Sequence, residues 1–154
     1  HKFHGIIWCI GCQDFTIKEE GMNLKALFES ALEASSHTYS PYSSFPVGAA
    51  ILLPDGTVIT GTNVENRSYG LTNCAERTAI FSAVAKGYKT FSAIAIAAPK
   101  ADYPVSPCGA CRQVMSEFAP ETVPVIFGSS WDNRIETTIG KLFPFDSLHE
   151  LANS

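Results

Sequence analysis

Three cysteines, one alone and two in a C-x-x-C pair, constrain the folding of this chain more than any other feature. Cys74 and Glu76 lie in a C-A-E segment, and Cys108 and Cys111 lie in a P-C-G-A-C segment. Three thiolates fill three corners of a tetrahedral zinc site, and catalytic zinc sites leave the fourth corner to water. No fourth ligand stands at a suitable spacing, and a carboxylate follows the first thiolate by two residues. The pattern therefore indicates a zinc site that performs hydrolysis.

Both cysteine groups are expected at helix starts. Periodic apolar residues predict helices over residues 23–35, 74–86 and 108–118, with Gly87 after the second and Pro107 before the third. The unpaired N–H groups and the positive dipole at a helix N-terminus favour thiolate over thiol. We therefore expect two helix N-termini to face each other across the metal.

The remaining pattern predicts the fold class. Strands are expected over residues 47–53, 58–64, 91–98, 123–127 and 135–139, with a turn at residues 54–56. The order α-β-β-α-β-α-β-β favours an α/β fold, a three-layer α-β-α sandwich with a mixed five-stranded sheet and helices on both faces.

Composition excludes several classes of function. The 154 residues suit one domain with a proper core, and the net charge of −4 argues against a nucleic-acid partner. No apolar run approaches the roughly 20 residues that cross a membrane. Five cysteines are an odd number, and three are already expected as metal ligands. This usage fits a reducing cytosol better than a disulfide framework, so a cytoplasmic location is expected.

Residues 1–21 are interpreted as an artificial or poorly ordered extension, and residues 22–154 as the domain. The extension holds His1-x-x-His4 and Cys9-x-x-Cys12, which on paper would bind a second zinc. The alternative, that these short motifs have no role, is favoured because such patterns often occur by chance.

Two arginines stand beside the expected metal ligands. Arg77 follows Glu76 and Arg112 follows Cys111. Three thiolates around Zn²⁺ leave a net charge of −1, which weakens the acidification of a bound water. A guanidinium that donates to a ligand sulfur would withdraw part of that charge. The alternative is that both are ordinary helix-surface arginines.

Two polar residues end the second predicted strand. Asn63 and Glu65 lie two apart, so their side chains point to the same side and are a plausible grip for a sugar diol. An exposed polar strand end is the alternative. Phe45, in a loop rich in Pro and Ser, is either a core residue or a platform for an aromatic ligand.

Four ordered motifs between about residues 22 and 144 resemble one family. The chain looks like a cytidine deaminase of the small, homotetrameric class with one zinc per subunit. The matching segments are Tyr39-Ser-Pro-Tyr-Ser-Ser-Phe45-Pro-Val-Gly-Ala-Ala50, Asn63-Val-Glu-Asn-Arg-Ser-Tyr-Gly-Leu71, Cys74-Ala-Glu-Arg77 and Pro107-Cys-Gly-Ala-Cys-Arg-Gln113.

The resemblance implies a reaction and a metal centre. The reaction is hydrolytic deamination of cytidine and 2′-deoxycytidine to uridine and 2′-deoxyuridine plus ammonia, in pyrimidine salvage. Cys74, Cys108 and Cys111 would ligate zinc. Glu76, which is not a ligand, would carry protons between a water and the base.

The resemblance also implies a set of substrate contacts and an assembly. Phe45 would stack on the pyrimidine, and Asn63 and Glu65 would hold the ribose 3′-hydroxyl. The N–H of Ala75 would meet the pyrimidine carbonyl, and the Pro107 carbonyl would accept from the leaving amino group. Sites at the subunit interfaces of a homotetramer would receive Tyr69 from a neighbouring subunit at the ribose end.

One segment departs from the family pattern. Family members commonly carry Leu-Leu-Pro followed, three residues on, by a phenylalanine that closes a neighbour's site. Here the order is Leu-Phe-Pro-Phe145, and Ser147 stands at the expected place. Phe145 either reaches the ring by a shorter path or the contact is lost.

Three alternatives remain at this point. A relative that acts on another aminopyrimidine nucleoside, such as blasticidin S, shares the same motifs. A polynucleotide cytosine deaminase lacks support, because the chain is acidic and shows no basic, aromatic-interleaved groove. A non-catalytic zinc module would leave Glu76 without a purpose.

Overall fold

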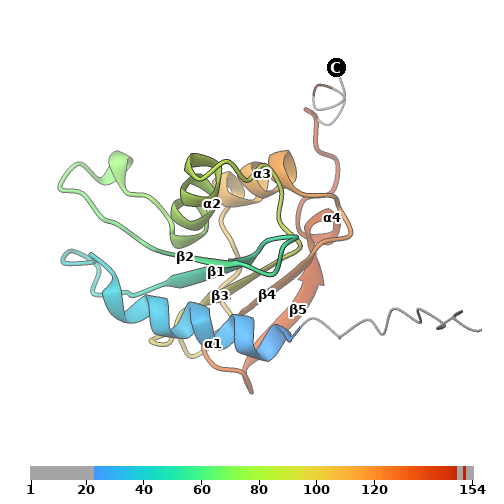
Figure 1. The fold of residues 1–154 in the computed structure, drawn as a ribbon. Coiled ribbons are helices and arrows are strands. Elements are labelled where there is room, and N and C mark those ends of the chain that lie inside the picture. The colour runs from blue at the N-terminus through green and yellow to red at the C-terminus, as the bar shows by residue number, and fades with distance from the viewer. Residues whose placement is uncertain (1–22, 149–150, 152–154) are drawn as a thin grey trace, which may run out of the picture.

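The computed structural model describes residues 23–148 and residue 151, and in it a five-stranded sheet lies between two helical layers (Figure 1). Helix α1 (Leu24–Ala34) covers one face, while α2 (Ala75–Ala85) and α3 (Gly109–Phe118) cover the other. The predicted three-layer α/β architecture is therefore confirmed. The predicted extension, residues 1–21 with its His and Cys motifs, lies outside the described residues.

The sheet is mixed, as predicted. Its strands are β1 (Gly48–Leu52), β2 (Val58–Thr62), β3 (Ala93–Ala97), β4 (Pro124–Gly128) and β5 (Arg134–Thr138), in the order β2-β1-β3-β4-β5. Only the central β3/β4 pair is parallel. Because β3 and β4 run parallel, their carboxyl ends share an edge of the sheet. In open α/β sheets, ligands bind outside such strand ends.

Alternation along the central strand divides the core in two. Strand β3 reads A-I-A-I-A and is buried throughout. Its alanines face α1, where Phe28 packs, and Ile94 and Ile96 face α2 and α3. Successive side chains of a strand point to opposite faces, so this pattern sets how closely the helices pack on each face of the sheet. Small residues let α1 lie close, and larger ones fill the layer beneath the site.

Glycine at position 61 brings α2 close to the sheet. A Cβ at Gly61 would lie 2.4 Å from the backbone N of Ala79 and 2.5 Å from the carbonyl oxygen of Ala75. Only a residue without a side chain fits there. At its other end α2 stops before Gly87, whose φ of +92° is the left-handed conformation expected after a helix. Gly61 thus lets the first half of the site's first helix lie against the sheet, and Gly87 follows the end of that helix.

Each strand ends one or two residues away from its predicted end, and two of these differences have a clear local cause. The strand expected over residues 58–64 stops at Thr62, because Val64 leaves the sheet to form isolated bridges with Tyr39 and Asn73. The strand expected over residues 135–139 stops at Thr138, whose hydroxyl caps the short helix α4 (Ile139–Leu142). Short 3₁₀ turns, η1 (Ser35–His37) and η2 (Tyr69–Leu71), were also not predicted.

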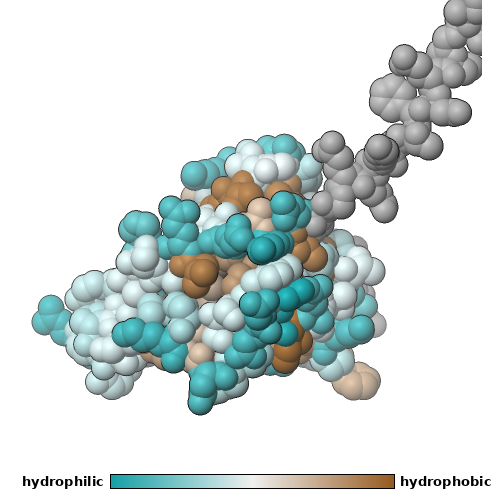
Figure 2. Space-filling model, turned by 90° about the horizontal axis from the view of Figure 1, so that it is seen from below, coloured by the Kyte–Doolittle hydropathy of each residue, from teal (hydrophilic) through white to brown (hydrophobic). Residues whose placement is uncertain are grey.

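The outer surface on the side of α1 mixes hydrophilic residues with small hydrophobic groups (Figure 2). Among the described residues, none of the helices has the length and apolarity that a membrane span requires.

Candidate active site

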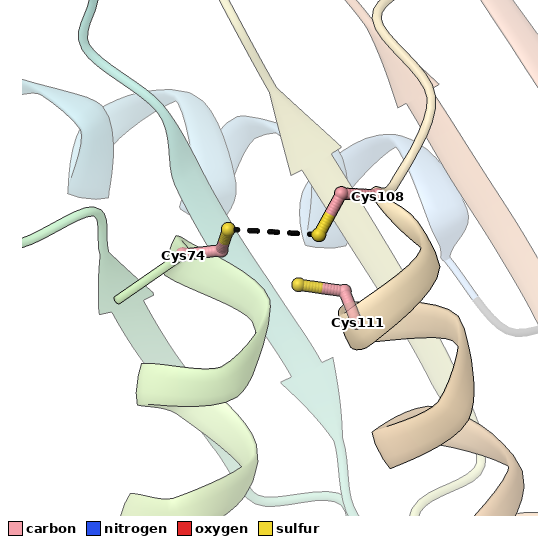
Figure 3. Close-up of side chains that lie close together, drawn as sticks. All are labelled: Cys74, Cys108 and Cys111. Carbon is pink, nitrogen blue, oxygen red and sulfur yellow. Dashed lines mark hydrogen bonds between the residues drawn. The ribbon is translucent and has the colours of Figure 1, made fainter. Parts of the chain in front are cut away.

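The three predicted cysteine ligands converge between α2 and α3. Cys74 is the N-cap of α2, Cys108 is the N-cap of α3, and Cys111 lies one turn further along α3 (Figure 3). Neither N-cap side chain accepts a capping hydrogen bond from the backbone of its own helix, so both sulfurs can turn toward each other. The three sulfurs all lie within 4.8 Å of one another.

The cluster fits a tetrahedral zinc ion. Zn–S bonds of about 2.3 Å at tetrahedral angles hold two sulfurs roughly 3.8 Å apart. The Sγ atoms of Cys74 and Cys108 are separated by 3.8 Å. In the described part of the chain the cluster has three ligand atoms, all sulfur. The donor set thus leaves one corner of the tetrahedron unused by the protein.

The thiols of the cluster differ in how readily they lose a proton. Hydrogen bonding from Cys111, followed by Arg77 and Cys108, lowers the pKa of the Cys74 thiol to about 5. The same interaction with Cys74, together with burial, raises the pKa of Cys111. Of these two thiols, Cys74 is therefore the first to ionise. A zinc ion held by these three cysteines would favour the thiolate form at each position, so its binding would release protons.

Arg77 supports this charge directly. Its Nη2 donates to the Sγ of Cys74 across 3.4 Å, and its Nε is buried without a hydrogen-bond partner in the described structure. The interaction with Cys74 raises the pKa of the Arg77 guanidinium, so the group stays cationic. This is the geometry in which a guanidinium withdraws charge from a ligand sulfur.

Arg112 is placed differently. Its Nε donates to the carbonyl of Pro107 at 2.8 Å, its Nη1 to the carbonyl of Leu142 at 2.9 Å, and its Nη2 to the hydroxyl of Ser106 at 3.1 Å. The sequence expectation that it donates to a sulfur is replaced by three contacts with oxygen. Leu142 is far along the chain, so sequence spacing gave no sign of this arrangement.

Glu76 lies beside the sulfurs in the first turn of α2. It is only 5% exposed, and burial raises the pKa of its carboxyl to about 7, assisted by the negative charge of Cys74. A buried carboxyl in this range both holds and releases a proton near neutrality. Among the described residues Glu76 makes no ion pair, although the charge of the nearby Arg77 partly opposes the rise in its pKa.

A cavity of about 390 Å³ opens onto the cluster. It contains four predicted substrate residues, Phe45, Asn63, Glu65 and Ala75, together with Cys74, Glu76 and Cys108. Its other lining residues were not predicted: Ser43, Val47, Thr72, Asn73, Ile96, Ala98, Val105 and Ser106. Ile96 and Ala98 mark the carboxyl end of β3, which the rule for open α/β sheets would have indicated. A second cavity of about 410 Å³, at the far end of α3, contains none of the predicted site residues.

Asn63 holds the loop that carries Phe45. Its Oδ1 accepts from the backbone N–H of Val47 at 2.9 Å and from the hydroxyl of Thr38. Its Nδ2 donates to the carbonyl of Phe45 at 2.9 Å. The amide thereby connects the end of β2 to both sides of the loop, and one of its two N–H bonds remains available to a ligand.

Glu65 holds the preceding part of the same loop. Its Oε2 accepts from the backbone N–H groups of Tyr42 at 2.9 Å and Ser43 at 3.2 Å, and its Oε1 accepts from the Ser43 hydroxyl. These bonds, that from the Ser43 hydroxyl foremost, lower the pKa of Glu65. The carboxylate is therefore ionised at neutral pH. Glu65 is 9% exposed and forms part of the cavity wall.

Three further predicted residues lie at the margins. Pro107 is buried next to Cys108 and is not one of the residues that line the cavity. Tyr69 is 75% exposed on η2 and packs edge-on against Tyr42. Both tyrosines line a hollow that shares Ser43, Glu65 and Thr72 with the main cavity. Phe145 is fully exposed, with a φ of +58°.

Known proteins resemble this chain over the same region. Residues 22–127 match the family model described as the cytidine and deoxycytidylate deaminase zinc-binding region. A cytidine deaminase of Sporosarcina psychrophila is 48% identical over 123 residues, covering 80% of this chain and 90% of the relative. The crystal structure of a cytidine deaminase from Burkholderia pseudomallei matches with a TM-score of 0.77 and 48% identity, covering 80% of this chain and 98% of the other. A blasticidin-S deaminase of Bacillus cereus is 34% identical over 137 residues, covering 84% of this chain and 94% of the relative.

The family-model match covers the cysteine cluster, Glu76 and the residues that line the cavity. The chain belongs to the cytidine and deoxycytidylate deaminase family, whose zinc-binding region it contains.

Proposed function

We propose that this protein hydrolyses cytidine and 2′-deoxycytidine to uridine and 2′-deoxyuridine with release of ammonia, a reaction of pyrimidine salvage. The observation that carries the proposal is the buried carboxyl of Glu76, which lies at the base of a nucleoside-sized cavity beside three converging sulfurs. Ligand sites in proteins commonly have volumes of about 300 to 1,000 Å³, and the cavity lies within that range.

The metal would be one zinc ion, held by Cys74, Cys108 and Cys111. Bound there, zinc would supply the Lewis acidity that makes water a stronger acid and a better nucleophile. The Arg77 guanidinium, 3.4 Å from the Cys74 sulfur, withdraws negative charge from the ligand set. The protein thus offsets the weak point of a three-thiolate site, which is its excess of negative charge.

Glu76 moves the protons. It takes one from the water as the water's oxygen adds to C4 of the pyrimidine, and it delivers that proton to N3. It then transfers the second proton of the water to the amino nitrogen, which leaves as ammonia. Water and cytidine are thereby converted to uridine and ammonia. One carboxylate serves both transfers because the water and both nitrogens lie on the same side of the ring.

The cavity wall would orient the nucleoside. Phe45 offers a ring face for the pyrimidine, and the free N–H of Asn63 and the carboxylate of Glu65 would bind the ribose 3′-hydroxyl. The N–H of Ala75 would donate to the pyrimidine carbonyl, and the Pro107 carbonyl would accept from the amino group. A pocket that pairs each polar group of its substrate rejects analogues that lack one.

We further infer a homotetramer in the cytoplasm, with sites completed across subunit interfaces. Large apolar side chains are exposed on α2 and on the loop before it, among them Phe81 at 47%, Leu71 at 70% and Tyr69 at 75%. Exposed apolar patches on soluble proteins mark interaction surfaces. The three ligand thiols suit a reducing compartment, where cysteines stay free to bind metal.

A second candidate substrate is another aminopyrimidine nucleoside such as blasticidin S, since a relative of that name matches at 34% identity. The same chemistry at C4 serves both substrates. A difference in the group attached to the ring nitrogen would be sensed at the Asn63 and Glu65 end of the cavity.

The test is the loss of the cytidine absorbance band with zinc-loaded protein, beside Glu76→Gln and a panel of cytidine, deoxycytidine and blasticidin S. We expect turnover of both nucleosides by the parent, and almost none by Glu76→Gln with zinc and fold retained. Turnover of blasticidin S alone would replace the proposed substrate. Near-normal activity of Glu76→Gln would contradict the role of Glu76.

A further inference from the structure

The guanidinium of Arg112 joins three separate segments of the chain. It donates backwards to Ser106 and Pro107, ahead of α3, and across to the carbonyl of Leu142 at the end of α4. The backbone N–H of Arg112 also bonds to the carbonyl of Cys108 at 3.0 Å. One residue therefore contacts the loop before the second cysteine group, the helix that carries it and a helix near the C-terminus.

The contact with Pro107 acts on the only soft backbone angle of that residue. The proline ring holds φ near −65°, so the direction of the chain into Cys108 depends on ψ alone. A rotation about ψ swings the Pro107 carbonyl, and the 2.8 Å bond from Arg112 Nε holds this oxygen in place. The bond from Nη2 to Ser106 holds the residue before it.

This restraint reaches the metal ligand Cys108. Its side chain makes no capping bond with its own helix, and its residue is exposed. The direction of its sulfur therefore depends on the backbone that enters the helix. Arg112 directly follows Cys111, and its side chain bonds to the residue before Cys108. It therefore links the backbone at one cysteine of the pair to the backbone at the other.

The same bond prepares the Pro107 carbonyl for substrate. A carbonyl oxygen accepts two hydrogen bonds, and Arg112 occupies one of them. On the proposed function, the remaining lone pair meets the amino group of the base. The contact with Leu142 supplies a partner for a helix-end carbonyl, and it anchors the segment from which Phe145 projects three residues later.

We propose that Arg112 is a positioning residue: its planar fork sets the Pro107 carbonyl and the Cys108 sulfur against the rest of the site. Its effect runs through Pro107, Cys108 and Leu142, not through contact with the metal or the base. For the carbonyl this rests on the proposed function, whereas for the cysteine it depends on the protein alone.

The experiment compares Arg112→Ala with Arg134→Ala in the full chain. Arg134 is a matched control, because it also makes several contacts, with Glu136 and with the carbonyl and ring of Trp131, but on strand β5 away from the site. Zinc affinity is measured by competition with a chelator, together with unfolding temperature and kcat and KM for cytidine. We expect Arg112→Ala to lower zinc affinity or kcat about 10- to 100-fold, as loss of a ligand-orienting partner does. Arg134→Ala should lower only the unfolding temperature.

Arg112→Lys tests whether the hydrogen-bond geometry of the guanidinium matters beyond its positive charge. It also provides the test if the alanine variant does not fold. Lysine keeps the positive charge but lacks the planar fork, so it should stay clearly below the parent in zinc affinity or kcat. A lysine variant equal to the parent overturns the proposal, as does an Arg112→Ala variant that behaves like Arg134→Ala. If the parent turns over no cytidine, the proposed function fails, and the zinc competition still decides the role of Arg112 at Cys108.

Discussion

The Nη2 of Arg77 donates to the Sγ of Cys74 across 3.4 Å, and this contact joins the cationic and anionic groups of the site within one turn of α2. Both residues lie at the helix N-terminus, whose dipole also favours negative charge on the sulfur. Glu76 stands between them in sequence yet points into the buried cavity. The first turn of one helix thus carries the Cys74 thiol, its charge partner and the buried carboxyl to which we assign the proton transfers.

Removal of this charge partner is expected to slow the reaction without loss of metal. Arg77→Ala leaves the full negative charge on the sulfurs, so a bound water is less acidic, and turnover should fall about tenfold or more. Arg77→Lys keeps a positive charge near Cys74 and should lose less. The measurements are kcat and zinc content on the same preparations. Parent-like turnover in the alanine variant would remove Arg77 from the mechanism.

Glu65 is expected to affect substrate binding through the loop that it anchors. Glu65→Gln removes the negative charge that strengthens three hydrogen bonds and reverses the direction of the one with the Ser43 hydroxyl, so the loop from Tyr42 to Phe45 loosens. Loss of charge-assisted bonds of this kind should raise KM by about tenfold. Ser43→Ala removes only one of the contacts and should have a smaller effect. An unchanged KM in Glu65→Gln would show that the carboxylate contributes neither to the loop nor to the ribose.

Close packing at Gly61 is expected to make α2 sensitive to a single methyl group. Gly61→Ala would place its Cβ 2.4 Å from the backbone N of Ala79, and backbone cannot move as a flexible side chain does. Overpacking of this kind costs about 1 to 3 kcal/mol, occasionally more. Gly70→Ala is the control, since a Cβ there meets no described atom within 4 Å. Denaturant unfolding of both variants measures the difference, and equal stability would contradict the close approach.

Phe145 is expected to matter to substrate binding but not to folding. The residue is fully exposed in one chain, so Phe145→Ala should leave the folding of the single chain intact. If it closes a neighbour's site in the proposed tetramer, KM should rise severalfold, because an aromatic contact contributes about 0.5–1.5 kcal/mol. The solution mass should be four times the 16.6 kDa of one chain. A monomer with parent-like activity would contradict both the assembly and this role for Phe145.

Much of the architecture was predictable because its causes are local. Alternation in A-I-A-I-A indicates a buried strand, and Gly87 marks the end of a helix by its conformational freedom. Strand ends were less predictable. Val64 has the composition of a strand residue, but its bridges run to Tyr39 and Asn73, which are distant from the β1/β2 hairpin.

The sequence by itself determined the metal centre. Cys74, Cys108 and Cys111 stand at helix starts, and both the residue types and the C-x-x-C spacing are local properties of the chain. Only the tertiary structure decided how the supporting groups are used. It directs Arg77 to sulfur and Arg112 to the carbonyls of Pro107 and Leu142, because long side chains bond to whatever the packed fold brings within reach. It also occupies most of the hydrogen-bonding capacity of Asn63 and Glu65 with their own loop, a contact between segments that no spacing along the chain encodes.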